Sequence, residues 1–196
     1  MFIVSRNENE VEFADAEFSY VSEVLKPIDA SLSKLNHEIS KADVWEVGCL
    51  CDKCEYLIGL GFCIMQRYMF DVLMDVNLKP LEARKLGPCS SFGEPVAELI
   101  HTAANYWKHE PEWHIWLEKL SKQSQETIDR VLHHRDSAHY PLSDLLADLN
   151  NSSDLTLLGC LPYLIDWRKA VFEYTEKNAI TNASRGTVNA WRFQSQ

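Results

Sequence analysis

The chain has 196 residues, enough for one domain with a buried core, and 46% of them are hydrophobic, which excludes a disordered chain. The formal net charge of −10 opposes binding to nucleic acid through a broad basic surface, although it is compatible with a local basic patch. We therefore expect no DNA binding and keep RNA as a candidate partner.

The N-terminus carries a short apolar run, Phe2 to Val4, which is too short for a signal peptide. We therefore expect a cytoplasmic protein, in which the six cysteines are reduced thiols and their even number does not indicate disulfides. Residues 1–11 are expected to form a polar N-terminal extension. No strand is expected, because no useful length of alternating polar and apolar residues occurs.

From about residue 12 the sequence has the periodicity of a helix. Its apolar residues recur at spacings of three and four over three heptads, which is typical of a continuous apolar seam. The seam consists of Phe18, Val21, Leu25, Ile28, Leu32, Leu35 and Ile39. Pro27 lies off the seam and predicts a kink or a break. The seam packs inside a bundle or against a second copy of the chain, and packing inside the bundle is favoured.

The stretch 44–76 predicts the central helix of the fold. It is apolar on nearly every face, as expected of a helix that other elements enclose. Its uninterrupted apolar run at 57–65 is nine residues long, whereas a membrane span needs about 20, so no membrane partner is expected. The small residues Gly59, Gly61 and Cys63 predict that another helix crosses closely at this point.

The rest of the chain predicts shorter helices separated by prolines and loops. They are expected from Glu94-Pro95 to the residue before Pro111, from 112 to 135, from 141 to 149 and from 162 to 179. Together the helices predict an all-α fold, a bundle of five or six mostly antiparallel helices over 12–179 around the central apolar helix at about 44–76. Residues 180–196 are expected to be a flexible C-terminal tail, with a segment that docks on a neighbour as the alternative.

The cluster Cys49-Leu-Cys51-Asp-Lys-Cys54 is the candidate metal site of the chain. Zinc takes four tetrahedral ligands, commonly from two pairs of cysteines, and the sequence has no second pair. Cys49 also lies about 200° from Cys51 around a helix, at roughly 100° per residue. We therefore expect small buried thiols, with no metal and no other cofactor, and keep a small zinc-binding helical protein as an alternative.

Polar residues on two predicted helices form a candidate binding groove. Glu55 and Gln66 fall on one face of the central helix, and the next helix carries a polar row that ends at His109. The groove residues are Glu55, Gln66, His101, Asn105, Lys108 and His109. His101 and His109 are too far apart to share a zinc ion, because eight residues span about 12 Å of helix. Alternatively these groups make a packing network or face water.

A third candidate site pairs arginine with histidine one helical turn apart. Arg130 precedes His134, and Arg135 precedes His139, each by four positions. A guanidinium can stabilise charge that develops on a phosphate, and an imidazole can transfer protons near neutral pH, so these pairs suit phosphodiester chemistry. Alternatively they form a basic helix C-terminus, which the helix dipole favours.

The segment Arg135-Asp-Ser-Ala-His139-Tyr140 resembles the motif of the HEPN superfamily, in which Arg and a polar residue precede His with four to six intervening residues. The resemblance implies a compact and often dimeric helical bundle. Many members are metal-independent ribonucleases of toxin–antitoxin, abortive-infection or CRISPR systems, so the resemblance also implies catalytic roles for Arg135 and His139. Here only three residues intervene, which favours a diverged or inactive member.

Three functions follow from these observations. We expect a HEPN-like protein of a prokaryotic defence or stress system that acts on RNA, as an active, diverged or inactive endoribonuclease that needs no metal. The first alternative is a non-catalytic module for protein–protein interaction or dimerisation, and the second is the zinc protein. The expected partner, besides RNA, is a second copy of the chain or another protein.

Overall fold

The fold is built almost entirely from helices. The computed structural model describes residues 2–6, 11–74, 76, 78–115, 120–133, 139–152 and 155–193. In chain order they form β1 (Phe2–Arg6), β2 (Val11–Ala14), α1 (Ala16–Ile39), α2 (Val44–Met74), α3 (Pro80–Ala83), α4 (Val96–Ile115), α5 (Lys122–Leu132), α6 (Pro141–Asn150), the 3-10 helix η1 (Leu158–Cys160) and α7 (Leu161–Phe193). The predicted all-α class is confirmed, with seven α-helices in the described residues instead of five or six.

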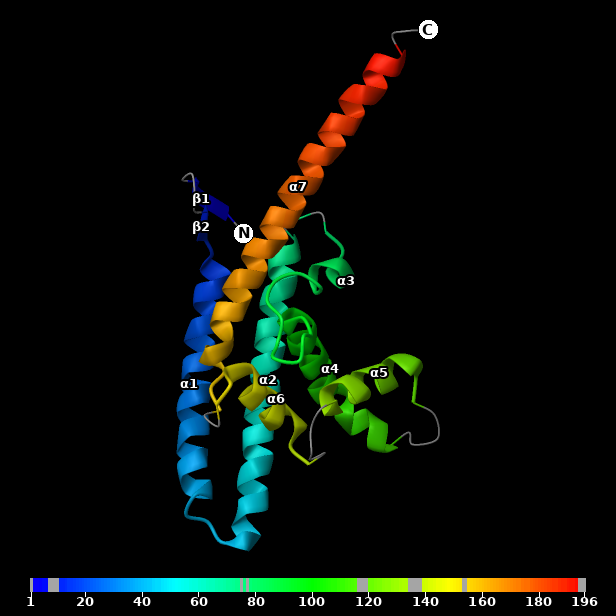
Figure 1. Cartoon of the computed structure of the whole chain (residues 1–196). Helices are drawn as coiled ribbons and strands as arrows, with labels where there is room; N and C mark the ends of the chain where they lie inside the picture. Colours follow the sequence, from blue (N-terminus) through cyan, green and yellow to red (C-terminus); the bar gives the residue numbers. More distant parts are fainter. Residues whose placement is uncertain are drawn as a thin grey trace.

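Helix α2 occupies the middle of the bundle. It packs antiparallel against α1 on one side and against α4 on another (Figure 1). Helices α6 and α7 also contact α2, and α5 packs against α4. The C-terminal part of α7 extends past the other helices (Figure 1).

The core lies where these helices meet α2. Its fully buried large side chains include Leu25, Leu32, Ile58, Phe62, Met65, Ile100, Leu145, Leu146 and Trp167. The indole Nε1 of Trp167 donates a hydrogen bond of 2.9 Å to the carbonyl oxygen of Ala83. The buried polar atom of this tryptophan therefore has a partner, and the bond holds the end of α3 against α7.

Two glycines of α2 allow other segments to approach closely. A Cβ atom on Gly59 would lie 2.0 Å from Cδ1 of Trp107 in α4, and one on Gly61 would lie 2.4 Å from Cδ1 of Leu157. The predicted close crossing of a helix is therefore confirmed at Gly59. At Gly61 the neighbour precedes η1 and lies outside a helix.

One side of α2 is exposed, so the expectation that other elements enclose it is wrong on that side. Tyr56, Phe70 and Met74 are 62%, 40% and 82% exposed. Among the described helices, α2 alone has the length and composition of a membrane span, and 56% of its 18-residue apolar window is buried inside the fold. Because α1 and α4 flank α2 without meeting over it, a strip of the helix stays uncovered.

The N-terminus forms a β-hairpin instead of a polar extension. Strand β1 pairs antiparallel with β2, with Ile3 opposite Phe13 and a shift of register before Ser5. The ring of Phe13 packs edge-on against Phe172 of α7, with 5.7 Å between the ring centroids. The expectation of no strand is wrong here, because strands of five and four residues are too short to give a clear period-two pattern.

Two prolines lie inside helices, one at Pro27, where the sequence predicts a kink or a break, and one at Pro111, where it predicts that the helix has ended. Helix α1 continues through Pro27, and α4 continues through Pro111 to Ile115. A proline removes one backbone hydrogen bond, so packing of the turns around it must offset that loss. The rings of Tyr106 and Trp113 pack edge-on across Pro111, with centroids 5.4 Å apart, and hold the last turn of α4 in place.

The later helix boundaries also differ from those predicted. Helix α5 begins at Lys122 instead of residue 112, with Ser121 as its N-cap, whose hydroxyl accepts a hydrogen bond from the N–H of Ser124 at 3.0 Å. Helix α7 continues to Phe193, through most of the range expected to be a flexible tail.

Two carboxylates from α1 and α2 cap helices elsewhere in the chain. Asp29 of α1 accepts hydrogen bonds from the backbone N–H groups of Leu157 and Leu158 at 2.7 and 3.0 Å, where η1 begins. Glu55 of α2 accepts from two backbone N–H groups in the first turn of α6, at 2.7 and 3.0 Å. Each carboxylate therefore satisfies donors that have no partner within their own helix.

A buried ion pair connects the start of α1 to α7. Arg168, which is 7% exposed, pairs with Asp15. The hydroxyl of Tyr68 in α2 donates to Asp15 Oδ2 at 2.6 Å, and the N–H of Phe18 donates to Asp15 Oδ1 at 2.9 Å. Burial alone would raise the pKa of the Asp15 carboxyl, but the hydrogen bonds from Tyr68, Phe18 and Arg168 outweigh it and lower the pKa.

The close contact at Gly61 gives a stability prediction. We expect Gly61→Leu to lower the free energy of unfolding by about 1–3 kcal/mol, because the added atoms overlap Leu157 and overpack the core. Chemical denaturation measures this change. Gly48→Leu on the same helix is the control, because a Cβ atom at Gly48 meets nothing within 4 Å. Equal unfolding midpoints for the two variants would contradict the packing described for Gly61.

Candidate functional site

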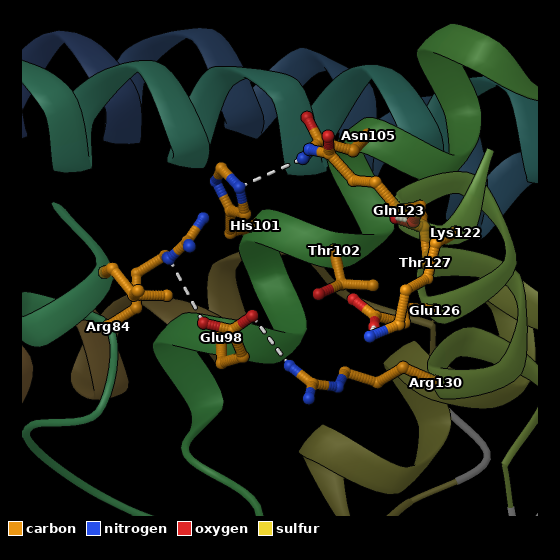
Figure 2. Close-up of a pocket in the computed structure, with 11 residues that line it drawn as sticks. Arg84, Glu98, His101, Thr102, Asn105, Lys122, Gln123, Glu126, Thr127 and Arg130 are labelled. Carbon is orange, nitrogen blue, oxygen red and sulfur yellow. Dashed lines mark hydrogen bonds and ion pairs between the residues drawn. The ribbon is translucent and has the colours of Figure 1, made fainter.

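A polar pocket of about 570 Å³ lies between the chain after α3 and the facing sides of α4 and α5 (Figure 2). Apart from Leu81, every residue that lines it is polar or charged. The polar lining consists of Arg84, Glu98, His101, Thr102, Asn105, Lys122, Gln123, Glu126, Thr127 and Arg130. A pocket of this size and composition can hold a small polar ligand or one unit of a larger one.

Glu98 holds two arginines at one end of the pocket. Its Oε2 lies 3.1 Å from Arg84 Nε, and its Oε1 accepts a hydrogen bond of 2.6 Å from Arg130 Nη1 (Figure 2). Arg130 Nε also lies 3.6 Å from a carboxylate oxygen of Glu94. The Nε atom of Arg84 is buried and makes no hydrogen bond within the described part of the chain, in spite of its short distance to Glu98.

Four of the predicted groove residues form one hydrogen-bond network between α2 and α4. The buried side-chain Nε2 of Gln66 donates to Asn105 Oδ1 at 3.0 Å and lies 2.9 Å from His101 Nδ1. Asn105 Nδ2 lies 3.0 Å from His101 Nε2. Lys108 Nζ donates to Gln66 Oε1 at 2.7 Å. The four groups thus make a packing network, which the sequence analysis names as the alternative to a binding groove. The network also fixes His101 and Asn105 where they line the pocket.

His101 is neutral at pH 7. Burial, and then the nearby charges of Arg84 and Lys108, lower the pKa of its imidazole to about 4. The hydrogen-bond arrangement agrees, because each ring nitrogen faces a side-chain amide nitrogen, of Gln66 and of Asn105. A neutral imidazole can accept a hydrogen bond at one of these positions, whereas an imidazolium would place an N–H group opposite an N–H group at both.

A second, smaller pocket of about 300 Å³ continues from the first along α4 and α5. It shares Asn105, Gln123 and Thr127 with the first pocket and is completed by His109, Glu112, Trp113, Ser121 and Ser124. His109 Nδ1 lies 3.3 Å from Glu112 Oε2 at the surface. We call the two pockets together the α4–α5 groove.

Glu55 does not line either pocket of the α4–α5 groove, which corrects its predicted place there. Its carboxylate accepts hydrogen bonds from the N–H of Leu142 at 2.7 Å and from the N–H and hydroxyl of Ser143 at 3.0 and 2.7 Å. Burial raises the pKa of Glu55 more than these hydrogen bonds lower it. The buried carboxylate is a helix cap, because the start of α6 supplies the donors that it needs.

The predicted catalytic pair is not assembled by the described residues. Arg135 lies outside them, as does His134. His139 is exposed beside Tyr140, with 6.5 Å between the ring centroids, and it lines neither pocket of the groove. Arg130, by contrast, lies in the groove through its contact with Glu98.

The predicted metal alternative has no assembled site among the described residues. Cys49 is exposed, Cys51 is half-buried and Cys54 is buried, so the three thiols lie in different environments. No group of three or more His, Cys, Asp or Glu side chains in the described part of the chain could hold a metal ion. Burial, with the charges of Cys51 and Glu55, raises the pKa of the Cys54 thiol to about 11.

Sequence reasoning missed the α5 and α3 sides of the groove. Lys122, Glu126 and Arg130 recur every four residues and so share a face of α5, but the sequence does not show that this face lies opposite α4. Arg84 follows α3 at the edge of a loop, where no periodicity marks it.

Comparison with known proteins returned no match. No protein-family model matches the chain, and neither a curated protein nor a solved structure matches it. The chemistry of the groove is therefore judged from its residues and their geometry.

The pKa of His101 predicts how stability depends on pH. Because the folded pKa of about 4 lies below the ordinary value of 6.5, the unfolded chain binds more protons between these values, and acid favours unfolding. We expect the free energy of unfolding to fall by about 1 kcal/mol through this group between pH 7 and pH 5, allowing for its partial exposure.

Urea unfolding of the wild type and His101→Gln at both pH values measures the effect. The variant should lose less stability in acid, while His37→Gln, at an exposed position on α1, should behave as the wild type does. Parallel pH curves for the wild type and His101→Gln would show that the imidazole keeps its ordinary pKa.

Proposed function

We propose that this chain is a HEPN-like helical-bundle protein of a prokaryotic defence or stress system that binds RNA in the α4–α5 groove, as a diverged member without ribonuclease activity. One observation carries the proposal: Arg84, Lys122 and Arg130 gather in one pocket of a chain whose net charge is −10. In an acidic protein, such a concave cluster of cations is the place where a phosphate is attracted.

The arginines at Glu98 are suited to hold a phosphate. A guanidinium has five N–H donors, so the contact of Arg84 with Glu98 and the contacts of Arg130 with Glu98 and Glu94 leave donors for a ligand. Glu98 keeps Arg84 and Arg130 beside one end of the pocket. Glu98 and Glu126 offset part of the positive charge, which fits one or two phosphates better than a long stretch of backbone.

The other end of the α4–α5 groove is suited to a base. Trp113 is half-buried there, next to His109, and bases of single-stranded RNA stack on aromatic rings of this kind. Asn105 lies where the two pockets join, and its amide can pair with the edge of a base. The groove therefore offers a cationic end for phosphate and an aromatic end for a base.

The geometry favours binding over cleavage. General acid–base catalysis works best with a pKa near the operating pH, and the pKa of His101 is about 4. Both ring nitrogens of His101 already face amides of the network. His139 lines neither pocket, and His109 lines only the second pocket, whereas Arg84 and Arg130 line only the first, so no arginine and exposed histidine share one pocket among the described residues.

RNA binding is the first test of this function. We expect Arg130→Gln to raise the Kd for a single-stranded RNA about 10- to 100-fold, because a lost charge-assisted hydrogen bond costs about 1.5–3 kcal/mol. Fluorescence anisotropy at two salt concentrations measures the affinity. Lys34→Gln, on an α1 side chain that is 79% exposed, removes the same charge outside the groove and should bind as the wild type does. Absence of wild-type binding, or the same loss in both variants, would remove the assignment.

Cleavage of the same RNA at neutral pH with EDTA present is the second test. We expect no cleavage by the wild type, and none by Arg135→Ala or His139→Ala. Metal-independent cleavage by the wild type that both substitutions abolish would contradict the inactive assignment. Such a result would make the protein an active ribonuclease. Loss of general acid–base catalysis reduces a rate by about 10²–10⁴-fold, which is the loss of cleavage rate to expect in each variant.

The second candidate function is a module for self-association without chemistry of its own. The observation that favours it is the exposed apolar side of α2, where Met74 is 82% exposed. This surface does not line the α4–α5 groove, so the two functions are compatible.

A further inference from the structure

Thr102 has a buried side chain whose hydroxyl the described part of the fold does not use. The residue is 6% exposed, and it lines the larger pocket of the α4–α5 groove. A threonine hydroxyl on a helix commonly donates to a backbone carbonyl one turn earlier, as Thr127 does to Gln123 at 3.0 Å. The Thr102 hydroxyl makes no such bond and has no other partner among the described residues. Because a buried polar group without a partner is costly, this hydroxyl is suited to a ligand.

Thr102 lies in the middle of the groove. On α4 it comes four residues after Glu98, which holds the two arginines, and three residues before Asn105, where the two pockets join. At about 1.5 Å per residue, these steps are about 6 and about 4.5 Å along the helix axis. Figure 2 shows Thr102 between the Glu98 end of the pocket and Asn105. In a nucleotide the sugar lies between the phosphate and the base, so the sugar of a bound nucleotide falls beside Thr102.

Glu126 faces the same part of the pocket from α5. Figure 2 shows its carboxylate reaching from α5 into the pocket on the side of Thr102. Its Oε1 lies 3.4 Å from Lys122 Nζ, and the side chain is 66% exposed, so the other oxygen is available to a ligand. Carboxylates bind ribose hydroxyls in dinucleotide-binding proteins. Together the two side chains offer a hydroxyl, which can donate or accept, and a carboxylate, which accepts.

We propose that Thr102 and Glu126 bind the 2′-hydroxyl of a ribose, and that this contact makes the groove select RNA over single-stranded DNA. The inference rests on the proposed function, because it needs a nucleotide with its phosphate at the arginines and its base toward Asn105. The 2′-hydroxyl is the group that distinguishes RNA from DNA, and it both donates and accepts. In the complex it donates to the Glu126 carboxylate and accepts from the Thr102 hydroxyl, so all three groups have a partner.

The surroundings of Thr102 favour a sugar over a second phosphate. Glu98 and Glu126 flank it on facing helices, and their charges would repel a phosphate placed between them. A deoxyribose would present a C–H group instead of the hydroxyl. It would leave the Thr102 hydroxyl unpaired in the complex and cover the Glu126 carboxylate without a donor. Sites built to bind a hydroxyl reject ligands that lack it mainly through this penalty.

Two ligands that differ only in the 2′-hydroxyl test the inference. They are a single-stranded RNA and the same sequence as DNA with uracil in place of thymine, and fluorescence anisotropy measures both Kd values. We expect the wild type to bind the RNA about tenfold more tightly. Thr102→Val keeps the shape of the side chain and removes the hydroxyl. It should raise the Kd for RNA about 2- to 10-fold and should not raise the Kd for DNA.

Glu126→Gln is the second variant, and its readout is the ratio of the two Kd values. The substitution also removes a charge that repels phosphate, which affects both ligands alike and cancels in the ratio. Because an amide accepts from the 2′-hydroxyl less strongly than a carboxylate does, the ratio should move toward one.

Two further variants are the controls. Thr175→Val makes the same change on α7 outside the groove, where the hydroxyl donates to the carbonyl oxygen of Phe172, and should keep both wild-type Kd values. Arg130→Gln removes a contact to the phosphate that RNA and DNA share, so it should weaken both ligands and keep their ratio. Thr102→Val should not lower the temperature of unfolding, because the described residues give its hydroxyl no partner.

The outcomes separate this inference from the proposed function. Equal wild-type affinity for RNA and DNA would overturn the inference and leave RNA binding in the groove intact. So would an RNA preference that both Thr102→Val and Glu126→Gln retain, or a lower temperature of unfolding for Thr102→Val, which would show that the fold uses this hydroxyl. Absence of wild-type binding to either ligand would remove the proposed function and the inference together.

Discussion

The buried contact between Asp15 and Arg168 is the constraint on which the rest of the fold depends. Asp15 caps α1, accepts the hydroxyl of Tyr68 in α2 and pairs with α7, so one carboxylate joins three helices. The guanidinium of Arg168 also lies 4.4 Å from the centroid of the Phe13 ring, which ties the β-hairpin to the same point. A buried charge must be paired, and loss of one partner costs about 3–5 kcal/mol. The ion pair of Arg168 with Asp15 therefore holds the start of α1 against α2 and α7.

With α2 fixed in this way, successive residues along it serve different surfaces. Gln66 is buried towards α4, where it orients Asn105 and His101 beside the pocket. Arg67 follows it in the chain but lies about 100° further round the helix, exposed at the edge of a groove between α1 and α2.

The sequence was informative where a long pattern determines the structure. The α1 seam and the apolar stretch at 44–76 correctly predict the helices α1 and α2. The structure brings His101, Asn105 and Lys108 of the predicted groove together at Gln66. The sequence was poorly informative where packing overrides a local signal, as at Pro111, where the contact between Tyr106 and Trp113 keeps α4 helical. That error moved the predicted start of α5 from Lys122 to residue 112. Glu55 was misplaced because its partners are backbone N–H groups of α6, which no side-chain pattern reveals.

The caps at Glu55 and Asp29 also have a consequence for the order in which the chain folds. The starts of α6 and η1 take their hydrogen-bond acceptors from residues 87 and 128 positions earlier in the chain. Formation of these two helix starts is thus coupled to the prior presence of the α1–α2 hairpin, whose own contacts are local and quickly made. During synthesis the hairpin leaves the ribosome first and presents both carboxylates before their partners exist. The starts of α6 and η1 are therefore capped only once they dock on α1 and α2.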